Sequence, residues 1–354
     1  MSREAIRVVV ADDSAFIRRL VASYFTPKAG FCVVGEAGNG IEAIDAVRRF
    51  QPDVLTLDLE MPEMDGLEAL RTIMQAAPMP VVAISGVSGK AATRTLQALD
   101  LGAVDFVLKF TPGVTMDPES LAREIVEKTR LAAGIQVVRL LGRPRESFEQ
   151  KPAPPSFAGG MLPGIVVIGA STGGPMALRE LLAQLPAAFR APIIIVQHIP
   201  AFFTSVLASQ LNRYCQLPVR EAEDGEALTP GVVYVAPGGY HLLLQTGLRV
   251  HLQKGEDVPG EHCPSIDVTM ESASRLLGAR IAGVLLSGMG VDGVQGLSTI
   301  RRQGGRTFAQ DEATSVVFGM PKRAIELGAV ITVDSPARIG SALVAAYESG
   351  GAHA

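Results

Sequence analysis

Apolar runs of strand length alternate with amphipathic segments along the first third of the chain. Continuous β-branched runs separated by helix-length segments are typical of parallel strands that are covered on both faces. The predicted strands are residues 6–11, 31–36, 54–57, 81–84 and 104–108. Helical periodicity covers about residues 14–25, 40–50, 66–76, 88–101 and 118–131. The pattern predicts a (βα)5 unit over residues 1–131.

A second alternating pattern begins at Gly164. Its predicted strands are residues 165–169, 192–197, 281–286, 305–309 and 329–333. Its predicted helices are residues 175–185, 201–212, 265–277, 292–303 and 321–327. Short strands with glycine-rich turn signals lie between about 217 and 252, and they predict an antiparallel hairpin region. We therefore expect a doubly wound, mostly parallel α/β sheet with an inserted antiparallel hairpin over residues 161–350.

Residues 132–160 separate the two patterns. This stretch is rich in proline, glycine and charge and has no sustained periodicity, which is typical of an interdomain linker. The 354-residue length also agrees with two domains rather than one.

Composition and charge exclude several classes of protein. A net charge of −4 argues against a nucleic-acid partner, because such partners require a cationic surface. The three cysteines are widely spaced and form no CxxC pair, which favours a reduced, cytoplasmic protein. No apolar stretch approaches the ~20 residues of a membrane helix, and the first residues do not form a signal peptide. We expect a cytoplasmic protein that is not embedded in a membrane.

Polar side chains follow the predicted strands of the first domain. Asp12 and Asp13 end the first strand, Asp58 the third, Ser85 the fourth and Lys109 the fifth. The carboxyl ends of parallel strands meet at one edge of a sheet, so these groups are expected to lie together. Crowded carboxylates repel one another unless a hard cation such as Mg²⁺ neutralises them. The alternative is that the acids cap helices or lie in a loop.

These positions resemble the response-regulator receiver family. The resemblance is carried by the motifs ADDS, LDLEMPEMDG, AISG and DFVLK and covers about residues 5–131. It implies that Asp58 is the phosphoacceptor. It also implies that Mg²⁺ is held by Asp12, Asp13, Asp58 and the backbone carbonyl of Glu60.

The same resemblance implies that Ser85 and Lys109 bind the phosphoryl group. Phe106 occupies the position of an aromatic that changes its orientation on phosphorylation, although an ordinary core phenylalanine is the alternative. One position departs from the family pattern, because Phe110 follows Lys109 where receivers usually carry proline.

Ser171 lies in a glycine-rich turn between a predicted strand and a predicted helix. The run Gly-Ala-Ser-Thr-Gly satisfies the GxSxG pattern in the strand–turn–helix context of a nucleophilic serine. Amides at the start of the helix can donate to an oxyanion. A phosphate-binding turn and a merely tight turn remain alternatives.

A serine nucleophile requires a base and an acid that orients it. His198 follows an apolar strand and should therefore emerge at the same sheet edge as Ser171. Asp292 lies at a later strand-to-helix turn, where it could also cap its own helix. The chain order Ser, His, Asp differs from the Ser, Asp, His order of ordinary α/β-hydrolases.

The second domain resembles the chemotaxis protein-glutamate methylesterases, the CheB family. The motifs IGASTGGP, IVQHIP, YVAPGGYHL, CPSIDV and LLSGMGVDG carry this resemblance. It implies Ser171 as nucleophile, His198 as base and Asp292 as orienting acid. It further implies an oxyanion hole formed by the Thr172 region and the Met289 amide.

One departure from the CheB pattern lies in CPSIDV, where Cys263 replaces a usual arginine. His262 beside it could substitute as a substrate contact or could be a solvated loop histidine.

The combined resemblance implies hydrolysis of glutamate methyl esters on chemotaxis receptors with release of methanol, and deamidation of receptor glutamines. A CheA-type histidine kinase is the implied phosphodonor. The resemblance implies Mg²⁺ at the receiver site and no cofactor for the esterase chemistry. We expect the receiver to cover the esterase site until Asp58 is phosphorylated. The alternatives are a hydrolase of another ester or amide and a non-enzymatic binding module.

Overall fold

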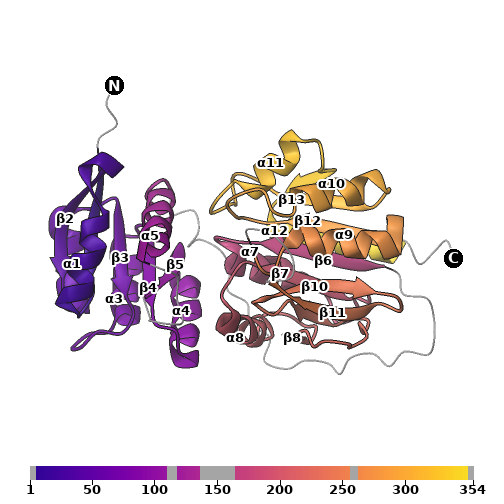
Figure 1. Cartoon of the computed structure of the whole chain (residues 1–354), viewed down its shortest axis with the longest axis horizontal. Helices are drawn as coiled ribbons and strands as arrows, with labels where there is room; N and C mark the ends of the chain where they lie inside the picture. Colours follow the sequence, from indigo (N-terminus) through magenta and orange to yellow (C-terminus); the bar gives the residue numbers. More distant parts are fainter. Residues whose placement is uncertain (1–4, 110–117, 136–163, 256–261, 350–354) are drawn as a thin grey trace. The chain divides into compact units, whose positions relative to one another are not determined.

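The computed structural model describes residues 5–109, 118–135, 164–255 and 262–349 (Figure 1). The chain divides into two compact units, residues 1–143 and 144–354. Phe110 and residues 136–160 of the predicted linker lie outside the described residues. Among the described residues, no helix has the length and apolar character needed to cross a bilayer.

The first unit contains a five-stranded parallel sheet with the strand order β2-β1-β3-β4-β5. Its strands are β1 (Ile6–Ala11), β2 (Phe31–Ala37), β3 (Val54–Asp58), β4 (Val81–Ser85) and β5 (Asp105–Leu108). Its helices are α1 (Ala15–Tyr24), α2 (Gly40–Phe50), α3 (Gly66–Ala76), α4 (Gly89–Leu101) and α5 (Pro118–Ala133), with a short 3₁₀ helix at Pro27–Ala29. The predicted (βα)5 fold is confirmed.

Local capping explains where four of these helices begin. The side chains of Ser14, Asn39, Asp65 and Ser88 each accept a hydrogen bond from the amide three residues later. Such caps satisfy amides that have no partner inside the helix. They therefore fix the points at which the chain leaves each strand end.

The second unit contains a seven-stranded parallel sheet with the order β14-β13-β12-β6-β7-β9-β8. Its strands are β6 (Ile165–Ala170), β7 (Ile193–Gln197), β8 (Val219–Glu221), β9 (Val233–Val235), β12 (Ile281–Leu285), β13 (Arg306–Gln310) and β14 (Thr332–Asp334). A separate antiparallel pair is formed by β10 (Tyr240–Gln245) and β11 (Arg249–Lys254). The predicted parallel sheet with an antiparallel hairpin is confirmed.

Helices cover this sheet, and one face also carries the hairpin. The helices are α7 (Gly174–Leu182), α8 (Ala201–Leu211), α9 (Ile266–Leu277), α10 (Val294–Arg302), α11 (Met320–Glu326) and α12 (Pro336–Ser349), with a 3₁₀ turn at Gly278–Arg280. Side chains of β6, β7, the hairpin, α9 and α10 share one buried apolar cluster. Burial of this cluster is the main force that holds the unit together.

Three details differ from the pattern-based predictions. The strands β8 and β9 were expected to be antiparallel, but they pair in parallel and extend the main sheet. Each has only three residues, so its periodicity carries no information about the direction of its partner. The last strand begins at Thr332 rather than 329, because Leu327 and Gly328 close α11. The terminal helix α12 was not predicted.

The order of the strands brings the predicted catalytic positions together. β6 lies between β7 and β12, and Ala170 pairs with Gln197. Residues that directly follow these three strands therefore emerge at one edge of the sheet. Adjacent strands lie about 4.8 Å apart, so side chains at this edge can reach one another.

Candidate functional sites

An acidic pocket lies at the carboxyl edge of the first sheet. Lys109 Nζ lies 2.6 Å from Asp58 Oδ2 and 3.1 Å from Asp12 Oδ2. Carboxylate oxygens of Asp12, Asp13 and Asp58 lie within 4.8 Å of one another. The Glu60 amide donates to Asp58 Oδ1 over 3.1 Å. The structure thus brings the three acids and Lys109 together, as predicted.

Burial decides the protonation of Asp58. Desolvation raises the pKa of Asp58 to about 6, and the hydrogen bond and positive charge of Lys109 only partly oppose it. The negative charge of Asp12 adds to the increase. Burial would lower the pKa of Lys109, but its contacts with Asp58 and Asp12 outweigh that effect and raise it.

The pocket has the donor set that a small divalent cation requires. Asp12 Oδ2 is buried and accepts no well-aligned hydrogen bond from the described residues, although Lys109 Nζ lies 3.1 Å away. Mg²⁺ prefers carboxylate oxygens, and this site offers those of three acids. Mg²⁺ also retains several waters, which suits a site whose Asp13 is exposed to solvent. These residues therefore fit the predicted Mg²⁺.

Ser85 and Phe106 lie on the neighbouring strands of the same sheet. Ser85 Oγ accepts a hydrogen bond from the buried Thr95 hydroxyl. The Phe106 ring is buried, and Lys128 Nζ lies 5.3 Å from its centre and donates to its carbonyl over 2.7 Å. Lys128 also contacts Asp105, at 3.5 Å. Phe106 therefore adopts an inward orientation that α5 supports.

In the second unit, Ser171 lies on the turn between β6 and α7. Its amide donates to the carbonyl of Ser287 over 3.0 Å, and its carbonyl accepts from the Gly174 amide over 2.8 Å. Gly173 has a φ of +77°, and a Cβ there would lie 2.4 Å from Val316 Cβ. Only glycine satisfies both the conformation and the space at this position. The turn therefore holds Ser171 at the sheet edge with little freedom.

His198 and Asp292 form a hydrogen-bonded pair beside Ser171. His198 Nε2 lies 2.8 Å from Asp292 Oδ2, and both side chains are largely buried. The His198 amide donates to the carbonyl of Ala170, the residue before Ser171, over 3.0 Å. Two of the three predicted catalytic residues are thus in direct contact, and the third lies on the adjacent strand end.

The Asp292 carboxylate lies on the N-terminus of α9 rather than on that of its own helix. It accepts hydrogen bonds from Ser265 Oγ over 2.9 Å, the Ile266 amide over 2.7 Å and the Asp267 amide over 3.0 Å. The alternative that Asp292 caps α10 does not describe the structure, because Gly293 occupies that position without a side-chain bond. A helix N-terminus is a natural site for an anion.

This environment keeps Asp292 ionised. Burial alone would raise its pKa, but the bonds from His198, Asp267 and Ile266 outweigh that cost and lower the pKa to about 2. An ionised Asp292 accepts from Nε2, so Nε2 carries the proton and Nδ1 is left as the basic nitrogen. Nδ1 of His198 is buried and has no hydrogen-bond partner among the described residues.

Three supporting residues were missed by the sequence analysis. Asp267 accepts the Gly296 amide over 2.6 Å and so ties α9 to α10, the helix that follows Asp292. Buried His241 accepts the Ser265 amide at Nδ1 over 3.2 Å, and burial lowers its pKa. Gln197 donates to the Ser171 carbonyl over 2.9 Å. These contacts join distant segments, so no local pattern could have identified them.

The predicted oxyanion donors lie close to Ser171. A Cβ at Gly288 would lie 2.7 Å from Ser171 Cβ, so a glycine allows this loop to approach the serine. No described residue accepts from the amide of the next residue, Met289, whose side chain is 40% exposed. The Thr172 carbonyl accepts the Ser287 hydroxyl over 2.7 Å, which ties the serine turn to the same loop.

The hydroxyl of Ser171 makes no hydrogen bond to His198 within the described ranges. Catalytic hydrogen bonds are often long in ligand-free hydrolases and tighten when substrate binds. The strand register nevertheless restricts the two side chains to adjacent positions at one edge.

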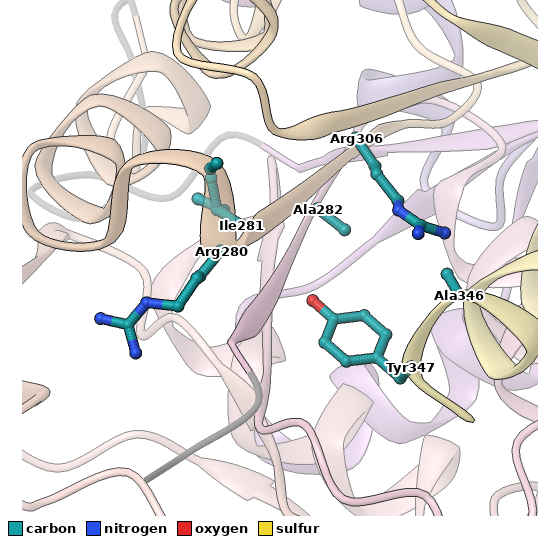
Figure 2. A pocket seen from close by; sticks show the side chains of 7 residues that line it. Arg280, Ile281, Ala282, Arg306, Ala346 and Tyr347 are labelled. Atoms are coloured by element: carbon teal, nitrogen blue, oxygen red, sulfur yellow. The ribbon is translucent and has the colours of Figure 1, made fainter. Parts of the chain in front are cut away.

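A cavity of about 210 Å³ lies at the opposite end of the sheet, where β12 and β13 begin. Figure 2 shows that the guanidinium groups of Arg280 and Arg306 point in different directions beside the ring of Tyr347. The Tyr347 hydroxyl donates to the carbonyl of Ile165 over 2.8 Å. The polar groups do not converge, so this cavity lacks the features of a binding site.

Comparisons with known proteins identify the family of each unit. Residues 8–116 match the model of the response regulator receiver domain, and residues 166–343 match that of the CheB methylesterase. The protein-glutamate methylesterase/protein-glutamine glutaminase of Archaeoglobus fulgidus is 43% identical, over 96% of this chain and 97% of its own length. The protein of the same name from Pyrococcus horikoshii is 40% identical, over 97% of this chain and 94% of its own length.

A solved structure supports the fold of the second unit. The CheB methylesterase catalytic domain of Thermotoga maritima is 43% identical and has a TM-score of 0.50, covering 51% of this chain and 97% of that domain. The class of protein is therefore a response regulator whose receiver domain precedes an α/β domain with a serine and a His–Asp pair. The chain belongs to the CheB methylesterase family.

Proposed function

We propose that this protein is a phosphorylation-activated protein-glutamate methylesterase of chemotaxis receptors that also deamidates receptor glutamines. The observation that carries the proposal is the His198–Asp292 pair, 2.8 Å apart. His198 directly follows β7, which pairs with the strand that leads to the tightly held Ser171. The names of relatives that match almost the whole chain support the substrate and the reaction.

In the proposed first step, Ser171 Oγ attacks the carbonyl carbon of a glutamate γ-methyl ester. His198 Nδ1 accepts the hydroxyl proton as the new C–O bond forms, and ionised Asp292 stabilises the resulting imidazolium through Nε2. The Met289 amide and the Thr172 region donate to the oxyanion. Collapse of the intermediate breaks the bond to the methoxy group, which leaves as methanol with the proton from His198.

In the second step, water attacks the glutamyl–serine ester while His198 takes the proton of that water. The bond to Ser171 Oγ then breaks, the serine regains a proton, and the receptor glutamate is released. A glutamine substrate follows the same steps, except that ammonia leaves instead of methanol.

We assign Asp58 as the phosphoacceptor, with a CheA-type histidine kinase as donor. Asp12, Asp13, Asp58 and the backbone carbonyl of Glu60 would hold Mg²⁺, which supplies positive charge for the carboxylates and the phosphoryl group. The buried Oδ2 of Asp12, which has only the Lys109 ammonium near it among the described residues, supports this assignment.

Ser85 and Lys109 would bind the phosphoryl oxygens through their hydroxyl and ammonium groups. Phe106 would change its inward orientation when Ser85 is recruited to the phosphoryl group.

We place the reaction in the cytoplasm. In the described part of the chain, no disulfide joins Cys32, Cys215 or Cys263, which suits a compartment that keeps thiols reduced. The phosphodonor kinase and the modified receptor segments would meet the protein there.

The test is methanol release from methylated receptor membranes, measured with and without a small-molecule phosphodonor. Wild type should respond to the donor, Ser171→Ala should release no methanol in either condition, and Asp58→Asn should lose the response only. Asp45→Asn changes an exposed aspartate of the same unit and should behave as wild type. Release of methanol by Ser171→Ala at the wild-type rate would exclude the proposed reaction.

A further inference from the structure

The ring of His262 lies face to face with the ring of His198. The ring centroids are 4.2 Å apart and the planes differ by 24°. His262 is exposed, whereas His198 is largely buried, so His262 covers one face of the proposed base. The reaction described above gives His262 no role.

The contact belongs to a short segment that holds both members of the His–Asp pair. His262 stacks on His198, and Ser265, three residues later, donates to Asp292 over 2.9 Å. Cys263 lies between these two residues in the sequence, and its thiol faces Gly255. A Cβ on Gly255 would lie 2.6 Å from Cys263 Sγ. The segment therefore places the imidazole, and not the thiol, against the catalytic pair.

A ring that is held only at one edge can still rotate out of plane. Asp292 holds His198 at Nε2, but that single contact does not fix the tilt of the ring. A stacked ring restricts this tilt, since it contacts the whole face. The tilt matters because it decides whether Nδ1 faces the hydroxyl of Ser171.

The stacked ring of His262 also favours the reaction through its electronic effect on His198. His198 becomes an imidazolium when it accepts the serine proton. A neutral aromatic face stabilises an adjacent cation, and the effect is larger where water is excluded. The stabilisation arises as the cation forms, so it favours the transition state over the resting enzyme.

We propose that His262 is a positioning residue that orients His198 toward Ser171 and stabilises its protonated form through the stacked face. This proposal rests on the proposed methylesterase function. It differs from the view that His262 replaces a substrate-binding arginine, because a substrate contact would act on KM, whereas positioning of the base acts on kcat.

The test compares His262→Ala, which removes the ring, with His262→Phe, which keeps a flat ring. Full-length variants are assayed for methanol release from methylated receptor membranes in the presence of a phosphodonor. The free energy that one stacked aromatic pair contributes predicts that His262→Ala lowers kcat about three- to tenfold with KM nearly unchanged. His262→Phe should remain within about twofold of wild type, since the face contact is retained.

A control variant, a substitute variant and a second measurement make the comparison specific. His251→Ala removes a partly exposed histidine of β11 that pairs with Asp224, at 3.5 Å, and should leave the kinetics unchanged. If His262→Ala fails to fold, His262→Gln provides the variant without a ring. The rate at which a fluorophosphonate labels Ser171 gives a second measure, and it should follow kcat across the series.

The proposal is overturned if His262→Ala has wild-type kcat, if it changes only KM, or if His262→Phe is as impaired as His262→Ala. Failure of the proposed function looks different, because wild type and Ser171→Ala would then release methanol at equal rates. In that case, labelling of Ser171 still reports whether the stacked ring supports His198.

Discussion

Two largely buried aspartates, Asp58 in the first unit and Asp292 in the second, show how environment determines charge. Each lies at the carboxyl edge of a parallel sheet, which is where the polar groups of the two sites lie. The pKa of Asp58 is raised to about 6, whereas that of Asp292 is lowered to about 2. Similar burial therefore leads to opposite protonation behaviour.

The difference comes from the partners of the two carboxylates. Asp58 faces the like charge of Asp12 and has Lys109 and one amide as its donors. Asp292 receives two amides at the start of α9, the Ser265 hydroxyl and the His198 ring. The contrast suits the proposed roles, because a cation-binding phosphoacceptor must lower its pKa when the metal binds, while an orienting acid must remain ionised throughout.

The largest expected effect is the loss of activity when Ser171, the proposed nucleophile beside the His198–Asp292 pair, is replaced. Ser171→Ala should lower methanol release by about 10⁴-fold or more, because no other group can form the covalent intermediate. The measurement is the initial rate on methylated receptor membranes.

Ser341→Ala is the matched control for this loss, since Ser341 is an exposed serine of α12 in the same unit. Near-normal turnover by Ser171→Ala would contradict the assignment of the nucleophile.

Removing the charge of Asp292 tests the second half of the comparison. Asp292→Asn should lower kcat by about 10³- to 10⁴-fold, because a neutral amide neither holds the tautomer nor stabilises the imidazolium. Histidine NMR of the same variant should show the loss of Nε2 protonation at His198. Asp334→Asn serves as a control, and a loss below tenfold for Asp292→Asn would argue against its orienting role.

The influence of the receiver on the second unit can be measured by truncation. A chain that starts near residue 155 should be more active than the unphosphorylated full-length chain. If the esterase site is uncovered in only a minor fraction of the full-length chains, the gain should be about tenfold or more, because minor states are populated at about 0.1–10%. Complete phosphorylation of the full-length chain should raise its activity by the same factor. Equal activity of the truncated chain and the unphosphorylated full-length chain would contradict an inhibitory receiver.

The smallest effect concerns stability, and it has opposite signs at the two aspartates. Folded Asp58 keeps its proton up to about pH 6, whereas the unfolded chain releases it near pH 4, so Asp58 lowers stability as pH rises through this window. Asp292 contributes stability that is complete above about pH 4 and is lost as pH falls towards 2. At pH 7 without Mg²⁺, Asp58→Asn should therefore be stabilised and Asp292→Asn destabilised, each by about 1–3 kcal/mol.

Calorimetric melting between pH 3 and 8 measures both changes. The gain of Asp58→Asn should shrink below pH 4, where wild type is protonated in both states. Mg²⁺ should stabilise wild type and leave Asp58→Asn nearly unaffected. Shifts of the same sign in the two variants would show that the carboxylates do not differ as described.

The sequence by itself determined the two α/β units, the positions of most strands, and the residues at their carboxyl ends. The reason is that strand boundaries and glycine turns are local features, so Asp58, Ser171 and His198 could be placed from the pattern around them. Periodicity over three residues could not reveal that β8 and β9 join the main sheet in parallel.

Only the tertiary structure decided how the placed residues interact. Asp292 is bound by the Ile266 amide, 26 residues away, and not by its own helix. That choice leaves Nδ1 of His198 as its basic nitrogen, and the stacking of His262 on His198 likewise joins distant segments. Such contacts depend on which elements the shared apolar core packs together, and local propensity does not encode that packing.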